Sequence, residues 1–245
     1  MKRTHPMLGV AMWLLAGAVI AAPMPLVTDS AALDRSYIPA LMLSNGKDPA
    51  RAKAAQDAYE IAWTQFAARQ RISYAGDAGW TKTLAAADAA NAQARAALAA
   101  GRMQDAHNAQ EVVRHALWDQ RKAMGVVYQP DALTDFHATM EVIIATAQGK
   151  SGAIGTADIA ALRAQLTQAR AQWQAVKSAR WDPADYALDG PRLDAYRASL
   201  ATEDQALDAF AAALDAGDSA QFGKAASAIK PPFAKAYAAF GVFPQ

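Results

Sequence analysis

Alanine is the feature that most constrains the fold, because it supplies 65 of the 245 residues. Alanine has the highest intrinsic helix propensity, and the β-branched residues that favour strands are few in this chain. Alanine side chains are small, so helices that carry them approach closely, while Trp, Tyr and Phe side chains supply most of the buried area. The composition therefore predicts an all-α protein.

Cysteine is absent, and the formal net charge is +1. A chain without Cys has no disulfide, no thiolate-ligated zinc, no iron–sulfur cluster and no covalently attached c-type haem. The near-neutral charge provides no basic surface for nucleic acid. These two observations exclude several large classes of metalloprotein and all strongly basic binding modules.

The N-terminal residues have the pattern of a secretory signal peptide. Lys2 and Arg3 precede an apolar run over residues 7–22, which ends in small side chains before Pro23. We expect cleavage after Ala21, so that residues 1–21 are a signal peptide and the mature chain is periplasmic or secreted. The apolar run is shorter than the roughly 20 residues that span a bilayer. We expect no transmembrane segment in the mature chain.

The chain also contains an internal similarity. Residues 80–126 match residues 196–242 without a gap. Alanine-rich helices resemble one another by chance, but the equal spacing of the paired glycines favours a duplication. The matched positions, with one tryptophan pair further upstream, are Gly101 with Gly217, Gly125 with Gly241, Arg114 with Lys230, and Trp63 with Trp173.

Each half is predicted to contain four helices joined by short connections, which makes sequential helices antiparallel neighbours. The predicted architecture is two tandem antiparallel four-helix, up-and-down bundle repeats, at residues 30–126 and 131–243. Gly101 and Gly125 are expected to adopt the left-handed conformation that follows a helix, and prolines 231 and 232 to kink or restart the last helix. The expected helices are 31–44, 49–70, 80–100, 103–124, 131–148, 156–179, 191–216 and 218–240, with Asp48, Thr156 and Asp218 as N-caps.

Three histidines remain after signal cleavage, and all lie on the two helices that flank the loop at residues 125–130. His115 with Asp119, and His137 with Glu141, are spaced i, i+4, so each pair shares one helical face. If the helices form a hairpin centred on residue 128, His115 lies level with Glu141 and Asp119 with His137. This set of two imidazoles and two carboxylates suits copper or zinc. Further donors near it are Met140, His107 and Glu111.

Two alternatives use the same histidines. In the first, the histidines belong to a structural network of ion pairs with Arg114, Arg121, Asp135 and Glu111, in which Arg121 lies level with Asp135. In the second, the bundle holds b-type haem non-covalently between a His and a Met, as small periplasmic bundles do. The haem ligands would be His137 with Met42, Met103 or Met124, and no spacing singles out one pair.

No motif in the sequence indicates an enzyme. There is no glycine-rich phosphate loop after a strand, no Gly-x-Ser-x-Gly elbow and no His-Glu-x-x-His, and the carboxylates are too scattered to assign an acid and a base. We expect a non-enzymatic protein that binds a metal ion or small ligand at the hairpin joining its halves. The alternatives are a structural or protein-interaction module with a periplasmic protein partner, or a b-type haem electron carrier.

Overall fold

The computed structural model describes residues 24–149, 155–217 and 219–244, and its regular elements are all helical. The prediction of an all-α protein is confirmed. The predicted signal peptide, residues 1–21, lies outside the described residues. Within the described ranges, no helix is both long and apolar enough to span a membrane. The elements are α1 (Met24–Ser44), α2 (Pro49–Ser73), α3 (Ala78–Ala99), α4 (Met103–Ala123), α5 (Gln129–Gln148), α6 (Thr156–Ser178), the 3₁₀ helix η2 (Pro183–Tyr186), α7 (Gly190–Ala216), α8 (Ser219–Ser227) and α9 (Lys230–Ala238).

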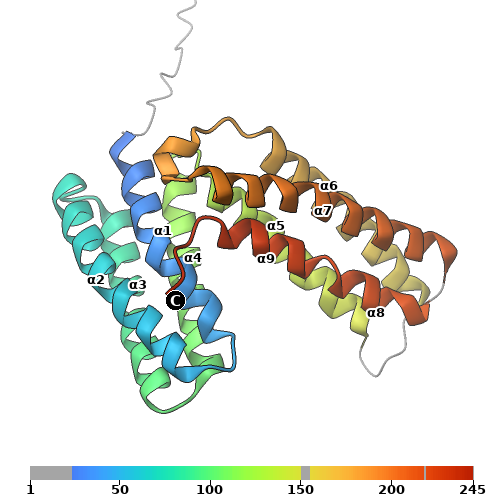
Figure 1. The fold of residues 1–245 in the computed structure, drawn as a ribbon, viewed down its shortest axis with the longest axis horizontal. Helices are drawn as coiled ribbons and strands as arrows, with labels where there is room; N and C mark the ends of the chain where they lie inside the picture. The colour runs from blue at the N-terminus through green and yellow to red at the C-terminus, as the bar shows by residue number, and fades with distance from the viewer. Residues whose placement is uncertain (1–23, 150–154, 218, 245) are drawn as a thin grey trace, which may run out of the picture.

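The helices form two groups that run in different directions (Figure 1). In the first group, α1 and α3 each pack against α2 and α4. In the second, α5 packs against α6, α8 and α9, and α7 packs against the same three helices. Helix α1 also contacts η2 and α9, so the first helix of the chain bridges the two groups. That the groups are repeats of one unit stays a prediction.

Most helix ends follow the predicted capping chemistry. The Asp48 side chain accepts hydrogen bonds from the backbone N–H groups of Ala50 and Arg51, so α2 begins where expected. Gly101 and Gly125 have φ values of 70° and 68°, the predicted left-handed conformation after α3 and α4, and Gly217 adopts it after α7. These helix ends are set by interactions between residues that are near neighbours in the chain.

Several helix boundaries differ from the expected ones. Helix α1 begins at Met24 and not at residue 31, and α2 continues to Ser73 and not to residue 70. The N-cap of α6 is Gly155 and not Thr156, and the Gly155 N–H donates to the Asp158 carboxylate at 2.9 Å. The last predicted helix is divided into α8 and α9, as its prolines predicted, because Pro231 and Pro232 have no N–H to continue the backbone hydrogen bonds. The predicted cap Asp218 lies outside the described residues.

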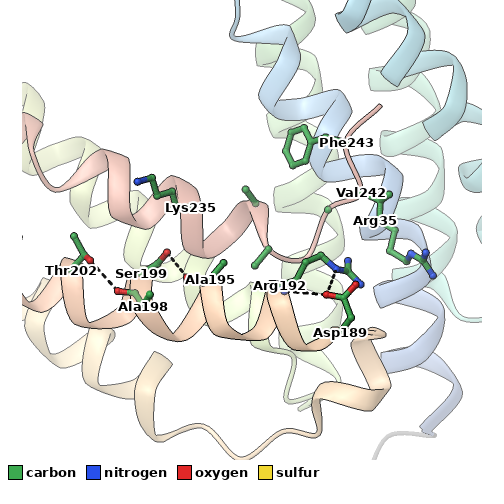
Figure 2. Close-up of a pocket in the computed structure, with 13 residues that line it drawn as sticks. Arg35, Asp189, Arg192, Ala195, Ala198, Ser199, Thr202, Lys235, Val242 and Phe243 are labelled. Atoms are coloured by element: carbon green, nitrogen blue, oxygen red, sulfur yellow. Dashed lines mark hydrogen bonds and ion pairs between the residues drawn. The ribbon is translucent and has the colours of Figure 1, made fainter. Parts of the chain in front are cut away.

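The C-terminal residues after α9 return to the first group of helices (Figure 2). The Val242 N–H donates to the Arg35 carbonyl of α1 at 2.7 Å, and Arg51 of α2 donates to the Pro244 carbonyl at 3.2 Å. A Cβ atom at Gly241 would lie 3.0 Å from side-chain atoms of Ile38 and Pro39. Glycine at this position therefore permits the close approach of the tail to α1.

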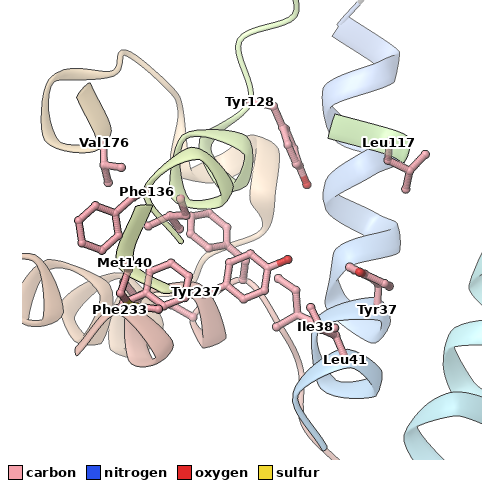
Figure 3. Packing of buried hydrophobic residues seen from close by; sticks show 14 of the residues in the cluster. Tyr37, Ile38, Leu41, Leu117, Tyr128, Phe136, Met140, Val176, Phe233 and Tyr237 are labelled. Atoms are coloured by element: carbon pink, nitrogen blue, oxygen red, sulfur yellow. The ribbon is translucent and has the colours of Figure 1, made fainter. Parts of the chain in front are cut away.

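Buried apolar side chains of both groups form one continuous core (Figure 3). Tyr37, Ile38 and Leu41 of α1 belong to the same cluster as Phe233 and Tyr237 of α9. The continuity means that the two groups share buried area where they meet and are not independent bundles connected by a linker. A cavity lined by residues of α1, α4, α5 and α9 lies at this junction.

A buried ion pair lies at the connection between the groups. Arg121 of α4 donates from two guanidinium nitrogens to the two carboxylate oxygens of Asp131 on α5, at 2.8 and 2.6 Å. The guanidinium carbon lies 4.5 Å from the centre of the Tyr128 ring, and the Tyr128 hydroxyl donates to Asp34 of α1 at 2.7 Å. Helices α1, α4 and α5 are thus joined through one buried polar network.

The register between α4 and α5 differs from the predicted hairpin. The predicted partner of Arg121 is Asp135, but Arg121 pairs with Asp131, and Asp135 lies 3.7 Å from Lys122. The prediction is wrong because α5 begins at Gln129 after an extended Tyr128 and then leaves α4 to join the second group (Figure 1). Residues further along the two helices are therefore not level as an antiparallel hairpin requires.

Candidate functional site

A cavity of about 450 Å³ lies between α1, α4, α5 and α9, where the two groups of helices meet. Its size falls within the range of small-molecule sites. Apolar and aromatic side chains from α1 and α9 face charged and amide side chains, most of them from α4 and α5. The lining residues are Leu41, Met42, Asn45, Gln104, His107, Asn108, Glu111, Arg114, His137, Glu141, Lys230, Phe233, Ala234 and Tyr237.

Arg114 is the central charged group of this cavity. Its side chain is 6% exposed and forms an ion pair with Glu111, one turn earlier on α4. The same terminal nitrogen lies 2.8 Å from His137 Nδ1 on α5. Its Nε has no hydrogen-bond partner in the described part of the chain. Arg114 therefore links the two groups of helices while retaining an unsatisfied donor.

The contact with Arg114 fixes the tautomer of His137. An arginine only donates hydrogen bonds, so His137 Nδ1 accepts and carries no proton. Nε2 then carries the hydrogen and faces Glu141 Oε1 at 3.5 Å. Burial, with a smaller contribution from Arg114, lowers the pKa of His137 although Glu141 acts in the opposite direction. His137 is thus neutral at physiological pH, and its ring stacks on Phe233 at 5.1 Å between centroids.

Glu141 is held ionised by its neighbours. The hydrogen bond from His137 and the ammonium of Lys230 lower the pKa of Glu141 to about 2. Lys230 Nζ lies 2.8 Å from Glu141 Oε1. Both side chains of this pair are about two-fifths exposed or more, so the pair contributes little to stability and opens at small cost.

His107 occupies the opposite wall, on α4. Its Nδ1 lies 3.1 Å from the Leu41 carbonyl oxygen, which only accepts, so Nδ1 carries a hydrogen. Its Nε2 lies 3.6 Å from Glu111 Oε1. The cavity therefore contains two i, i+4 His–Glu pairs, with Arg114 between them.

The structure separates the predicted metal ligands into two sets. His137 and Glu141 line the cavity, as do His107 and Glu111, which were only additional candidates in the sequence. His115 and Asp119 are exposed and do not line it, and His115 packs edge-on against Trp118 at 6.0 Å. Met140 is fully buried in the core.

Among the described residues, no three His, Cys, Asp or Glu side chains are grouped closely enough to hold a metal ion. The hydrogen bonds of His137 supply a physical reason. A metal on Nε2 requires the proton to move to Nδ1, where the Arg114 donor already points. The copper or zinc site stays a prediction that requires Arg114 to move.

The methionines proposed as haem ligands lie in different places. Met42 lines the cavity, whereas the Met124 sulfur accepts a hydrogen bond from the Trp80 indole at 3.2 Å. Met103 begins α4 and does not line the cavity. Both ring nitrogens of His137 are engaged, so a haem ligand role for this residue also stays a prediction.

Sequence reasoning did not assign Lys230, Phe233 or Tyr237 to the site, because α9 is far from α5 in the chain. One signal was available. Lys230 is the position matched to Arg114 in the internal similarity, and both residues line the cavity. Compared with known proteins, the chain matches no family model, and no curated sequence or solved structure is significantly similar to it.

Proposed function

We propose that this chain is a non-enzymatic binding protein whose junction cavity holds a small zwitterionic organic molecule. The observation that carries the proposal is the composition of the cavity wall, which combines two opposite-charge pairs with an apolar, partly aromatic face. Ligand sites of this size combine an apolar lining with a few placed polar groups that orient the ligand.

The charges of the arginine, lysine and glutamate side chains that line the cavity balance, and this balance favours one class of ligand. Arg114 and Lys230 are positive, Glu111 and Glu141 are negative, and His137 is neutral. A ligand with one charge gains a charge-assisted hydrogen bond with only one member of the exposed Lys230–Glu141 pair, whereas a ligand with two opposite charges gains one with each member. A ligand with an ammonium and a carboxylate replaces both members of the exposed Lys230–Glu141 pair.

The aromatic side chains of the cavity wall are placed to pack against the apolar part of the ligand. Phe233 and Tyr237 lie one turn apart on α9, with ring centroids 6.0 Å apart. The Tyr237 hydroxyl has no hydrogen-bond partner among the described residues, and Tyr237 lines the cavity. We infer that this hydroxyl is a further contact for a polar atom of the ligand.

The finer parts of the proposal rest on the sequence. Secretion to the periplasm or exterior rests on the pattern of residues 1–21, and two tandem four-helix repeats rest on the match between residues 80–126 and 196–242. The neighbour relations of the helices support the second. A binding role without catalysis is supported by the engagement of the cavity carboxylates in ion pairs.

Ligand binding is tested by thermal unfolding of the mature chain with a panel of free amino acids. We expect a matching zwitterion, at about 100 times its Kd, to raise the Tm by roughly 5–10 °C. The N-acetylated and the amidated forms, which each keep a single charge, are expected to give smaller shifts. Calorimetry should then show about tenfold weaker binding for Lys230→Gln and for Glu141→Gln, because each removes one charged contact.

The Lys177–Asp204 pair provides a matched control. Its atoms lie 2.8 Å apart, its side chains are similarly exposed, and it lies outside the cavity. Lys177→Gln and Asp204→Asn should leave binding unchanged. Equal binding of the singly charged derivatives, or unchanged binding by Glu141→Gln, would contradict the proposal.

The metal prediction has its own test in the same cavity. Because Arg114 occupies Nδ1 of His137, we expect zinc and copper to bind the wild-type chain weakly in a competition titration against a chelator. Replacing Arg114 with Met frees Nδ1, so this variant is expected to bind either ion more tightly than the wild type. Tight stoichiometric binding by the wild type, lost in both His107→Ala and His137→Ala, would instead support a resident metal.

A further inference from the structure

A groove with a volume of about 750 Å³ runs along α7 and α9 and reaches the C-terminal residues (Figure 2). Small side chains form much of its wall, including Ala195 and Ala198 of α7 and Ala238 of α9. Helix α9 contributes Lys230, Phe233, Ala234 and Tyr237 to the junction cavity and different residues to this groove. The groove is therefore a separate site.

Three cationic side chains border the groove, and a single carboxylate accompanies them. The cations are Arg35, Arg192 and Lys235, and the carboxylate is Asp189. Within the described ranges, Arg35 and Lys235 form no side-chain hydrogen bond or ion pair. Many other basic side chains on this protein are paired, as Arg170 is with Asp208 at 2.6 Å. The groove thus has an excess of positive charge.

Asp189 does not neutralise this excess. It caps α7 by accepting from the Arg192 backbone N–H at 3.0 Å, and its carboxylate also lies 3.4 Å from Arg192 Nε. A second guanidinium nitrogen of Arg192 donates to the Ala187 carbonyl, and the third has no partner in the described part of the chain. Asp189 is already committed to one cation and one helix end, which leaves Arg35 and Lys235 uncompensated.

We propose that this groove binds an elongated organic anion with an anionic group at each end, such as an α,ω-dicarboxylate. Lys235 lies toward one end of the groove, and Arg35 and Arg192 lie toward the other (Figure 2). The alanines between them face the apolar middle of such a molecule. Carboxylates bind arginine through charge-assisted hydrogen bonds, and the groove volume is within the range of small-molecule sites.

The test is calorimetric titration of the full mature chain with straight-chain dicarboxylates from four to ten carbons. Monocarboxylates of equal length and α,ω-diamines serve as comparison ligands. We expect binding that depends on chain length, weakens as salt is added, and exceeds that of the monocarboxylates. Arg35→Gln and Lys235→Gln should each weaken it about tenfold. Ala198→Trp, which fills the groove from an exposed position of α7, should abolish it.

Matched variants separate this site from general charge effects. Arg180→Gln and Lys82→Gln remove exposed cations that line neither the groove nor the junction cavity. Ala209→Trp adds the same side chain to α7 outside the groove. These three should bind dicarboxylates as the wild type does, and Glu141→Gln should too because it alters only the junction cavity. Absent binding, equal losses in the controls, or binding of acidic peptides without small dicarboxylates would overturn the proposal.

Discussion

Replacing Arg121 with Met is expected to lower the free energy of unfolding by about 3–5 kcal/mol, the usual cost of removing one member of a buried ion pair. The Arg121 side chain is 5% exposed and donates two hydrogen bonds to Asp131. Its removal leaves Asp131 buried without a counterion. An uncharged methionine side chain then replaces the guanidinium group over the face of the Tyr128 ring. Burial already raises the pKa of Asp34 to about 6, and Arg121 is the main influence that opposes this rise. Chemical denaturation at pH 7 measures the loss.

Two further variants test the cause of that loss. Arg170→Met removes an exposed ion pair of similar length, and we expect a change below about 1 kcal/mol. The double variant Arg121→Met/Asp131→Met should be more stable than the single one, because no charge at position 131 then remains buried and unpaired. A double variant that is less stable than Arg121→Met would show that packing, and not the uncompensated charge, dominates the effect.

Glu203 is expected to make the protein less stable as the pH rises from about 4.5 to about 8. Its side chain is fully buried, and neither carboxyl oxygen has a hydrogen-bond partner in the described part of the chain. Burial raises the pKa of Glu203 to about 8, although the nearby Phe233 backbone amide acts against it. In this pH window the folded protein retains a proton that the unfolded chain releases, so stability falls with pH. The full effect is about 5 kcal/mol.

Glu203→Gln removes this titration while keeping the shape of the protonated side chain. We expect it to match the wild type near pH 4 and to exceed it by about 3 kcal/mol at pH 7 and about 5 kcal/mol at pH 9. Asp194→Asn, an exposed carboxylate on the same helix that does not influence the pKa of Glu203, is the matched control and should leave the pH profile unchanged. Asp34 adds a slope of the same sign between about pH 4 and 6 in all three proteins. A wild-type profile parallel to that of Glu203→Gln would contradict the assignment.

The helices themselves were largely predictable from the sequence. Asp48, Gly101 and Gly125 mark helix ends through interactions within four or five residues, so their effect does not depend on the rest of the fold. The prolines at 231 and 232 divided the last helix for an equally local reason. The largest error is the start of α1, which begins at Met24 and not at residue 31, whereas the N-cap of α6 moved by one residue to Gly155.

The candidate site was only half predictable. The i, i+4 spacing correctly placed His137 and Glu141 on one face, and the same spacing applies to His107 and Glu111. The error lay in the register between helices. A hairpin centred on residue 128 requires α5 to lie along α4, whereas α5 packs on α6, α8 and α9. His115 was therefore left exposed, and Arg114 took the position opposite His137.

Alanine abundance and the absence of cysteine determined an all-helical protein without thiolate chemistry, and local caps determined where most helices begin and end. These properties depend on backbone propensity and on contacts between near neighbours in the chain. The tertiary structure alone decided that α1 bridges the two groups and that α9 supplies one wall of the junction cavity. It also decided that Arg35 of α1 and Lys235 of α9 border the same groove. Such meetings depend on how buried faces pack across the whole fold, which residue spacing within one helix does not encode.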